Sequence, residues 1–157
     1  SWQGDRFHGA GIYRSFVQGI PSRSRRGVLR GLHFQNPRAQ GKLVQVLHGD
    51  AFDVAVDLRL DSPTFGQWAG RRLSGDGLHQ LWVPEGFAHG FVALSERVDF
   101  HYKCTDYYTP DAEHTLRWDD PEVAVKWPIE DPEVSDKDAV GERLRALREA
   151  GHLFGDG

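Results

Sequence analysis

The sequence has very little cysteine, and its single thiol, Cys104, cannot form a disulfide within the chain. Nothing in the cysteine content therefore indicates an oxidising compartment. Long apolar runs are also missing: no stretch approaches the ~20 residues of a membrane-spanning helix, and the first residues lack the apolar core of a signal peptide. These absences lead us to expect a cytoplasmic protein that does not associate with membranes.

An excess of positive charge is missing too, since 19 Lys and Arg stand against 23 Asp and Glu for a formal net charge of −4. This balance disfavours a general nucleic-acid-binding protein. An anionic small molecule would instead need a local basic site. The run Arg23, Arg25 and Arg26 could pair with phosphate, although such a run is more often a solvated loop.

Repeats, low-complexity tracts and internal linkers are absent, and 157 residues fit a single domain. The many glycines and short apolar runs favour strands and turns over long helices. Seven short strands, spaced roughly 8–12 residues apart, predict an all-β sandwich or barrel. The expected strands are Val28–Gln35, Lys42–Leu47, Phe52–Leu58, Phe65–Leu73, Gln80–Val83, Phe91–Ala93 and Val98–Lys103.

The clearest alternation lies in Phe52–Leu58, where every second residue is apolar and Asp53 and Asp57 fall on the other face. The aromatic segment Trp118–Trp127 is expected to cover a sheet edge or a barrel end.

One convincing helix is expected at Asp138–Ala150, capped by Ser135 or Asp136 and stopped by Gly151. A short helix is expected around Asp5–Ile12, and a basic loop at Pro21–Gly27.

The segment Arg30-Gly31-Leu32-His33 is the first of four that could carry chemistry. A histidine on an apolar strand can act as a general base near neutral pH, although an isolated one is more often hydrogen-bonded in a core. Strict alternation places Arg30 and His33 on opposite faces. Both reach one site only if Gly31 marks a bulge or bend.

The other three segments contain Lys42, His89 and Tyr102. Lys42 opens an apolar strand, where a cation can stabilise developing negative charge, but a surface lysine is the commoner case. His89 sits among small residues in a turn that Pro84 and two glycines fix in place, unless it is simply solvated. Tyr102 can donate a proton or stack on a base, while core packing is its more frequent role.

Metal binding is not predicted, because the eight histidines form no H-x-H or H-x-x-x-H pair. A metal site assembled from residues distant in the sequence stays open.

The order and wording of these segments resemble the dTDP-4-dehydrorhamnose 3,5-epimerase family from about Phe16 to Asp138. The resemblance implies a single cupin-like jelly-roll domain over residues 1–157, a homodimer, and no metal or cofactor. The implied substrate is a dTDP-4-keto-6-deoxy sugar, dTDP-4-dehydro-6-deoxy-glucose, inverted at C3 and C5. The matching segments are G-V-L-R-G-L-H-F-Q, Q-G-K-L-V, F-D-V-A-V-D-L-R, S-P-T-F-G-Q-W, Q-L-W-V-P-E-G-F-A-H-G-F and Y-K-C-T-D-Y-Y.

The resemblance also implies roles for individual residues. His33 matches the general base, Tyr102 the general acid, and Asp138 the carboxylate that orients the base. Lys42 and His89 match residues placed around the sugar ketone, where they could stabilise an enolate.

Further positions follow from the same resemblance. Asp53 matches a carboxylate able to partner His89, and Tyr108 matches a tyrosine that stacks on thymine. The other implied substrate-binding residues are Arg30, Gln18, Glu113 and Lys137.

The resemblance weakens near the N-terminus. The family's Arg-Gly motif falls on Gly9-Ala10, its following glutamate on Arg14, and an asparagine that comes two positions after Gln18 on Ile20. We therefore expect a nucleotide-binding segment that is diverged or partly missing. A single-carbon 3- or 5-epimerase, a sugar-nucleotide 3,4-ketoisomerase, a non-catalytic cupin binding module and a metal-dependent cupin stay open as alternatives.

Overall fold

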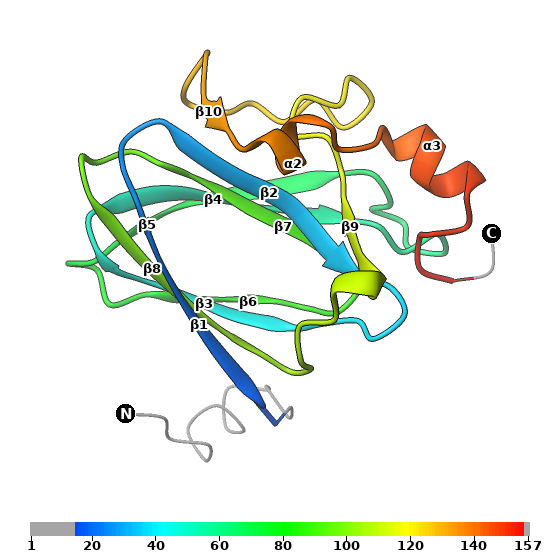
Figure 1. Cartoon of the computed structure of the whole chain (residues 1–157), viewed down its shortest axis with the longest axis horizontal. Coiled ribbons are helices and arrows are strands. Elements are labelled where there is room, and N and C mark those ends of the chain that lie inside the picture. The colour runs from blue at the N-terminus through cyan, green and yellow to red at the C-terminus, as the bar shows by residue number, and fades with distance from the viewer. Residues whose placement is uncertain (1–14, 156–157) are drawn as a thin grey trace.

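The computed structural model describes residues 15–155, which form two β-sheets that face each other and a C-terminal layer outside one of them (Figure 1). One sheet has the strand order β1-β8-β3-β6, and the other has the order β10-β2-β7-β4-β5, with β9 paired to β2. This confirms the predicted all-β sandwich. The strands are β1 Gln18–Ser24, β2 Val28–Gln35, β3 Lys42–His48, β4 Asp50–Asp57, β5 Trp68–Ser74, β6 Gln80–Val83, β7 Phe87–Ala93, β8 Val98–Cys104, β9 Glu113–Thr115 and β10 Glu133–Val134.

The space between the two sheets is one hydrophobic core. Phe91 of β7 and Phe100 of β8 stack across it with ring centroids 4.0 Å apart. Val44 and Val46 of β3 are at most 1% exposed and pack in the same cluster. Alternation in β4 turns Asp53 towards this interior, on the face opposite Val54.

A second core lies on the outer face of the larger sheet. Val54 and Val56 of β4 are fully buried there against Leu147 of the C-terminal layer. Trp127 joins this layer and meets Phe52 edge-on at 6.4 Å. The prediction that Trp118–Trp127 covers a sheet edge or barrel end was therefore wrong: this segment covers a sheet face, because that face is too apolar to be left in water.

The predicted helix Asp138–Ala150 is interrupted. It consists of α2 (Asp136–Ala139) and α3 (Leu144–Glu149). Between them the chain extends so that the Glu142 oxygen accepts from the nitrogen of Arg117 at 2.8 Å and the Glu142 nitrogen donates to Thr115 at 2.9 Å. These two bonds to the chain beside β9 replace helical ones.

The predicted cap at the beginning of this region and the predicted glycine stop at its end are both confirmed. Ser135 caps α2, since its side chain accepts from the Asp138 nitrogen. Gly151 ends α3 with a φ of +74°.

The expected loop Pro21–Gly27 was also wrong, because β1 runs to Ser24 and pairs with β8 along its whole length. Pro21 is tolerated because β1 is an edge strand, where a missing N–H costs no ladder bond. The largest differences between predicted and observed strand bounds are at the starts of β5 and β7. Residues 65–67 form a turn against Asp57, so β5 begins only at Trp68, while β7 begins earlier than expected, at Phe87. The expected helix Asp5–Ile12 lies outside the described residues.

Asp57, at the end of β4, carries a buried hydrogen-bond network beneath the β4–β5 turn. It accepts from Arg59 Nε at 2.9 Å, Ser62 Oγ at 2.5 Å and Thr64 Oγ1 at 2.6 Å. Burial opposes ionisation, but these donors outweigh it and hold the pKa of Asp57 well below its usual range.

We expect Asp57→Asn to lower the free energy of unfolding at pH 7 by about 2–3 kcal/mol, since hydrogen bonds to a charge are lost in a buried site. The stabilisation by Asp57 is complete above the ordinary aspartate pKa near ~4 and shrinks as the pH falls towards its lowered folded-state pKa. Denaturant unfolding at pH 7 and at acidic pH measures both effects. Asp99→Asn is the matched control, because solvent screens its pairs with Arg23 and Arg97; equal losses in the two variants would contradict the prediction.

Candidate active site

A small cavity of about 50 Å³ lies between the two sheets, near the ends of β2 and β8. It combines side chains from both sheets and from the segment after β8. Five of the predicted site residues line it. The lining residues are Ile20, His33, Phe34, Gln35, Gln40, Lys42, Tyr102, Tyr108 and Glu113.

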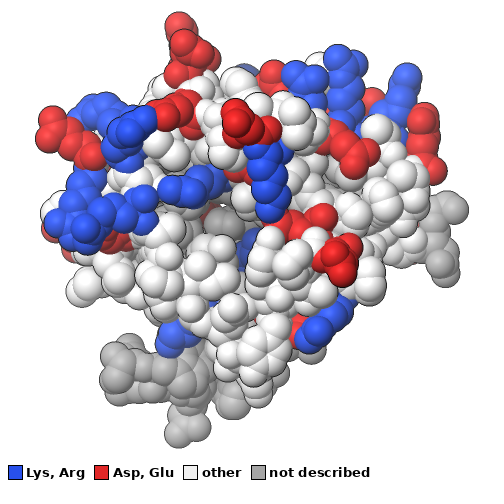
Figure 2. Space-filling model, viewed as in Figure 1, with Lys and Arg blue, Asp and Glu red and all other residues white. Residues whose placement is uncertain are grey.

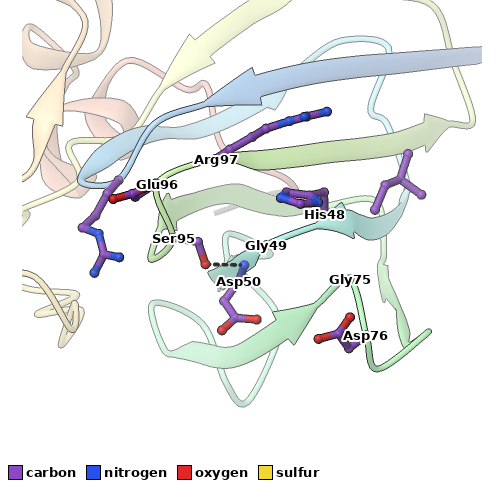
Figure 3. A pocket seen from close by; sticks show the side chains of 10 residues that line it. His48, Gly49, Asp50, Gly75, Asp76, Ser95, Glu96 and Arg97 are labelled. Atoms are coloured by element: carbon purple, nitrogen blue, oxygen red, sulfur yellow. Dashed lines mark hydrogen bonds between the residues drawn. The ribbon is translucent and has the colours of Figure 1, made fainter.

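A larger hollow of about 570 Å³ lies at the opposite end of the sandwich, among the loops that join the strands (Figure 3). Its side chains include His48 and Arg97, and the Asp50 nitrogen donates to Ser95 Oγ at 2.9 Å. None of the predicted catalytic residues lines it. We therefore place the candidate site in the smaller cavity. Several titratable side chains converge there, and this convergence is a better indicator of a functional site than the volume of a hollow.

On one wall of the cavity, His33 of β2 is hydrogen-bonded to Asp138 of α2, with 2.6 Å between His33 Nε2 and Asp138 Oδ1. The other carboxylate oxygen of Asp138 accepts from the Gly31 nitrogen at 3.1 Å. Asp138 is 3% exposed. Burial would raise the pKa of Asp138, but its bonds to His33 and Gly31 prevail and lower it. A carboxylate in this position fixes the orientation of the His33 ring.

Gly31 interrupts the regular alternation of β2. The pairing with β7 shifts register between Arg30 and His33, which confirms the predicted irregularity. Gly31 has a φ of +125°, and a Cβ there would lie 2.7 Å from the Gly90 Cα, so no other residue fits. With this bulge, Arg30 hydrogen-bonds to Ser24 of β1, and His33 shares a cavity with Ile20 of β1.

Arg30 lines a groove of about 320 Å³ beside the candidate cavity, where its Nε donates to Ser24 Oγ at 2.9 Å. Arg23 and Arg25 line the same groove. Figure 2 shows Lys and Arg side chains gathered on the part of the surface formed by β1 and β2, beside a hollow. Positive charge is therefore concentrated next to the cavity despite the negative net charge of the chain.

Tyr102 and Lys42 form the opposite wall, on β8 and β3. Burial raises the pKa of Tyr102 to about 12, so its phenol keeps its proton at neutral pH. The Lys42 Nζ lies 5.5 Å from the centre of the Tyr102 ring. Burial lowers the pKa of Lys42, and the nearby carboxylates of Glu113 and Asp53 partly oppose that shift.

Behind this wall, His89 and Asp53 form a second buried pair with 2.7 Å between Nε2 and Oδ1. The two residues are 4% and 0% exposed. Within residues 15–155, Asp53 Oδ2 has no hydrogen-bond partner. The His89 ring lies 6.2 Å from the Tyr102 ring, so this pair adjoins the candidate cavity.

At the mouth of the cavity, Lys137 of α2 forms an ion pair with Glu113 of β9. Gln18 Oε1 accepts from the Tyr108 nitrogen at 2.8 Å, and the Tyr108 side chain is largely exposed. A hydrogen bond to Glu113 raises the pKa of Tyr108. The structure thus brings all the predicted site residues to one region: four on the two walls of the cavity, two in the pair behind it, and five at the mouth or in the adjoining groove.

Gln35 is a site residue to which sequence reasoning gave no role. It is 2% exposed, and its side chain bonds the Tyr107 oxygen at 3.2 Å and the Thr109 nitrogen at 2.8 Å. It thereby fixes the loop that carries Tyr108. Its position two residues after His33, on the same strand face, was the signal that could have identified it.

Within residues 15–155, no group of three or more His, Cys, Asp or Glu side chains is arranged to hold a metal ion. Neither α2 nor α3 has the length or apolar character of a membrane-crossing segment, and the described part of the chain has no other helix that does.

The sequence profile of dTDP-4-dehydrorhamnose 3,5-epimerases matches residues 1–146. The chain belongs to this family. It is 58% identical to the dTDP-4-dehydrorhamnose 3,5-epimerase of Pseudomonas aeruginosa, over 81% of this chain and 71% of that protein. The corresponding Salmonella typhimurium enzyme is 54% identical over 83% of this chain and 72% of its own length.

Solved structures of epimerases share the fold. That of the dTDP-6-deoxy-D-glucose-3,5-epimerase of Legionella pneumophila, in complex with dTDP-4-keto-L-rhamnose, has a TM-score of 0.94 and 52% identity, covering 100% of this chain and 84% of that one. A 3'-monoepimerase from Streptomyces bikiniensis, in complex with dTDP-quinovose, has a TM-score of 0.89 and 30% identity, covering 97% and 78%. This chain is thus more similar in sequence to the 3,5-epimerase than to the monoepimerase.

Proposed function

We propose that this chain is an isomerase that inverts C3 and C5 of a dTDP-4-dehydro-6-deoxy-hexose, the reaction type named for its relatives. The observation that carries the proposal is the placement of two proton-transfer groups on facing walls of one cavity. The His33–Asp138 pair belongs to the larger sheet and the protonated Tyr102 to the smaller one. Inversion of a carbon requires removal of a proton from one face and delivery to the other, which such an arrangement supports.

In the proposed reaction His33 takes the proton from the carbon next to the C4 ketone. The electron pair of that C–H bond moves towards the ketone oxygen and gives an enolate. Lys42 and His89 stabilise this negative charge, with a contribution of about 3–4 kcal/mol for each well-placed donor. Tyr102 then gives its phenolic proton to the opposite face of the carbon, the carbonyl reforms, and both groups exchange with solvent before the next cycle.

The mouth supports binding of the nucleotide part of the substrate. The exposed ring of Tyr108 can stack on thymine. Arg30 and the basic groove can receive the diphosphate, with Lys137, Glu113 and Gln18 placed beside them. Binding energy from these remote groups can position the sugar for reaction.

Turnover of dTDP-4-dehydro-6-deoxy-glucose in heavy water tests the proposal. Because the new protons come from exchangeable side chains, deuterium should appear at both C3 and C5. Label at a single carbon would identify a single-carbon epimerase, and an unlabelled product would contradict the mechanism. Chelator treatment should leave the rate unchanged, since every proposed step uses side chains of the chain; a chelator-sensitive rate restored by added metal would favour a metal-dependent cupin.

Lys42 should determine the alkaline limb of activity. We expect kcat/KM to fall with a pKa below the ordinary lysine value of 10.5, because burial makes Lys42 lose its charge early. Tyr102, with its pKa raised to about 12, keeps its proton through this range. Lys42→Met should have a low kcat/KM, and this kcat/KM should not fall with the same alkaline pKa. A pH profile of both proteins measures it, and an unaltered limb in the variant would contradict the role of Lys42.

We also propose that the chain works as a homodimer in the cytoplasm. The edge strands β1 and β6 of the smaller sheet and the exposed apolar side chains of Val17 and Leu47 support a partner surface, because exposed edges are usually paired or covered. A cytoplasmic location fits a substrate built from a nucleotide. Sedimentation at micromolar concentration and cell fractionation test the two points, and a monomer would count against the first.

A further inference from the structure

Among the described residues 15–155, Ile20 is the one aliphatic residue that lines the cavity. Phe34 also lines it, but the Phe34 ring belongs to the outer core, where it stacks on His114 at 5.3 Å and meets Phe154 at 5.9 Å. The remaining lining side chains are polar, charged or phenolic. Of the residues that the structure describes, Ile20 is therefore the one that gives the cavity an aliphatic surface.

This apolar place lies beside the proposed acid. Ile20 pairs directly with Tyr102 across β1 and β8, so their side chains project from the same sheet face. The neighbour of Tyr102 on its other side is Val44 of β3, which is fully buried in the inner core and does not line the cavity. A group bonded to the carbon that Tyr102 protonates can therefore meet aliphatic surface at Ile20.

The proposed substrate carries one alkyl group on its sugar, the C6 methyl, and that methyl is bonded to C5. When C5 lies within reach of Tyr102, C6 must lie within one bond of the reacting carbon. We propose that Ile20 is a specificity-determining residue that packs against this methyl and holds C5 in position for protonation. The inference rests on the proposed function and deepens it: it assigns recognition of the 6-deoxy carbon to β1 and predicts a separate control of the two inverted carbons.

The test measures deuterium incorporation at C3 and at C5 separately, by NMR, during turnover of dTDP-4-dehydro-6-deoxy-glucose in heavy water. In Ile20→Ala we expect C5 labelling to slow by about tenfold, the effect of losing a methyl-sized contact in an apolar pocket. Labelling of C3, which bears no methyl, and the Kd of dTDP alone should stay close to those of the wild type.

Two further variants keep the test informative if Ile20→Ala folds poorly. Ile20→Val retains a branched apolar surface and should label C5 nearly as fast as the wild type. Ile20→Thr has a similar shape but places a hydroxyl against the methyl, and it should slow C5 selectively. Val140→Ala is the matched control, because Val140 is also a branched aliphatic residue, is 78% exposed and does not line the cavity.

Equal slowing at C3 and C5 would overturn the inference, since it would indicate a general structural effect. Weaker binding of dTDP alone would overturn it as well, because Ile20 would then contact the nucleotide. Unchanged labelling in all variants has the same consequence. A wild-type protein that labels neither carbon would instead overturn the proposed function, and this outcome is distinguishable from the others.

Discussion

His33→Asn should lower kcat by about 100- to 10,000-fold, the usual contribution of a general base, while the Kd of dTDP stays nearly unchanged. Asparagine can still hydrogen-bond to Asp138, but it cannot take a proton from carbon. Asp138 remains anchored by the Gly31 nitrogen and by the Ser135 cap, so the cavity should keep its shape. Steady-state kinetics and calorimetric dTDP titration measure the two quantities.

His114→Asn provides the matched control for this substitution. His114 lies on β9, paired with Phe34, and stacks on His152 at 4.2 Å outside the cavity. The same chemical change there should leave kcat close to the wild-type value. Retention of more than a few per cent of activity in His33→Asn would refute the assignment of the base.

Tyr102→Phe should separate proton removal from inversion. Without the phenol, delivery to the second face should fall by about 100-fold or more, while His33 still removes protons and returns solvent deuterium to the same face. The expected product of incubation in heavy water is therefore labelled substrate with unchanged configuration. NMR of the recovered sugar reads out label and configuration together.

The phenylalanine ring should preserve the packing of Tyr102 against Phe100, whose ring centre lies 6.2 Å away, so the melting temperature should change little. Tyr107→Phe, at a side chain that is 55% exposed outside the cavity, is the control. If Tyr102→Phe still inverted the sugar at the wild-type rate, another group would have to be the acid. If it lost labelling altogether, Tyr102 would be needed for proton removal.

The strands of the inner core could be predicted because their alternation is local. Val54 and Asp53 fall on opposite faces by period alone, and the structure keeps them there. The break between α2 and α3 could not be predicted in this way, because it depends on hydrogen bonds to Thr115 and Arg117, more than twenty residues earlier in the chain. For the same reason β1 was missed, since the strand that pairs with it among residues 15–155 is β8, far along the sequence.

The site shows the same division between local and distant information. The bulge at Gly31 could be anticipated because strict alternation would place Arg30 and His33 on opposite faces of one strand. The contact between His33 and Asp138, which are 105 residues apart, comes from tertiary structure, and only the resemblance to a family pointed to it. The location of Ile20 beside Tyr102 needed the strand register, which periodicity within one strand does not determine.

The outer core has a consequence for how the protein is made. The apolar face of β4 is complete once residue 57 has been synthesised, but its cover is contributed by residues from Leu116 to Leu153. A ribosome adding roughly 5–20 residues each second leaves that face uncovered for several seconds. The nascent chain therefore exposes an apolar face that can associate with other chains, although the two sheets of the inner core can already pack together. A premature stop between Leu116 and Leu153 should yield a chain that aggregates or occupies chaperones.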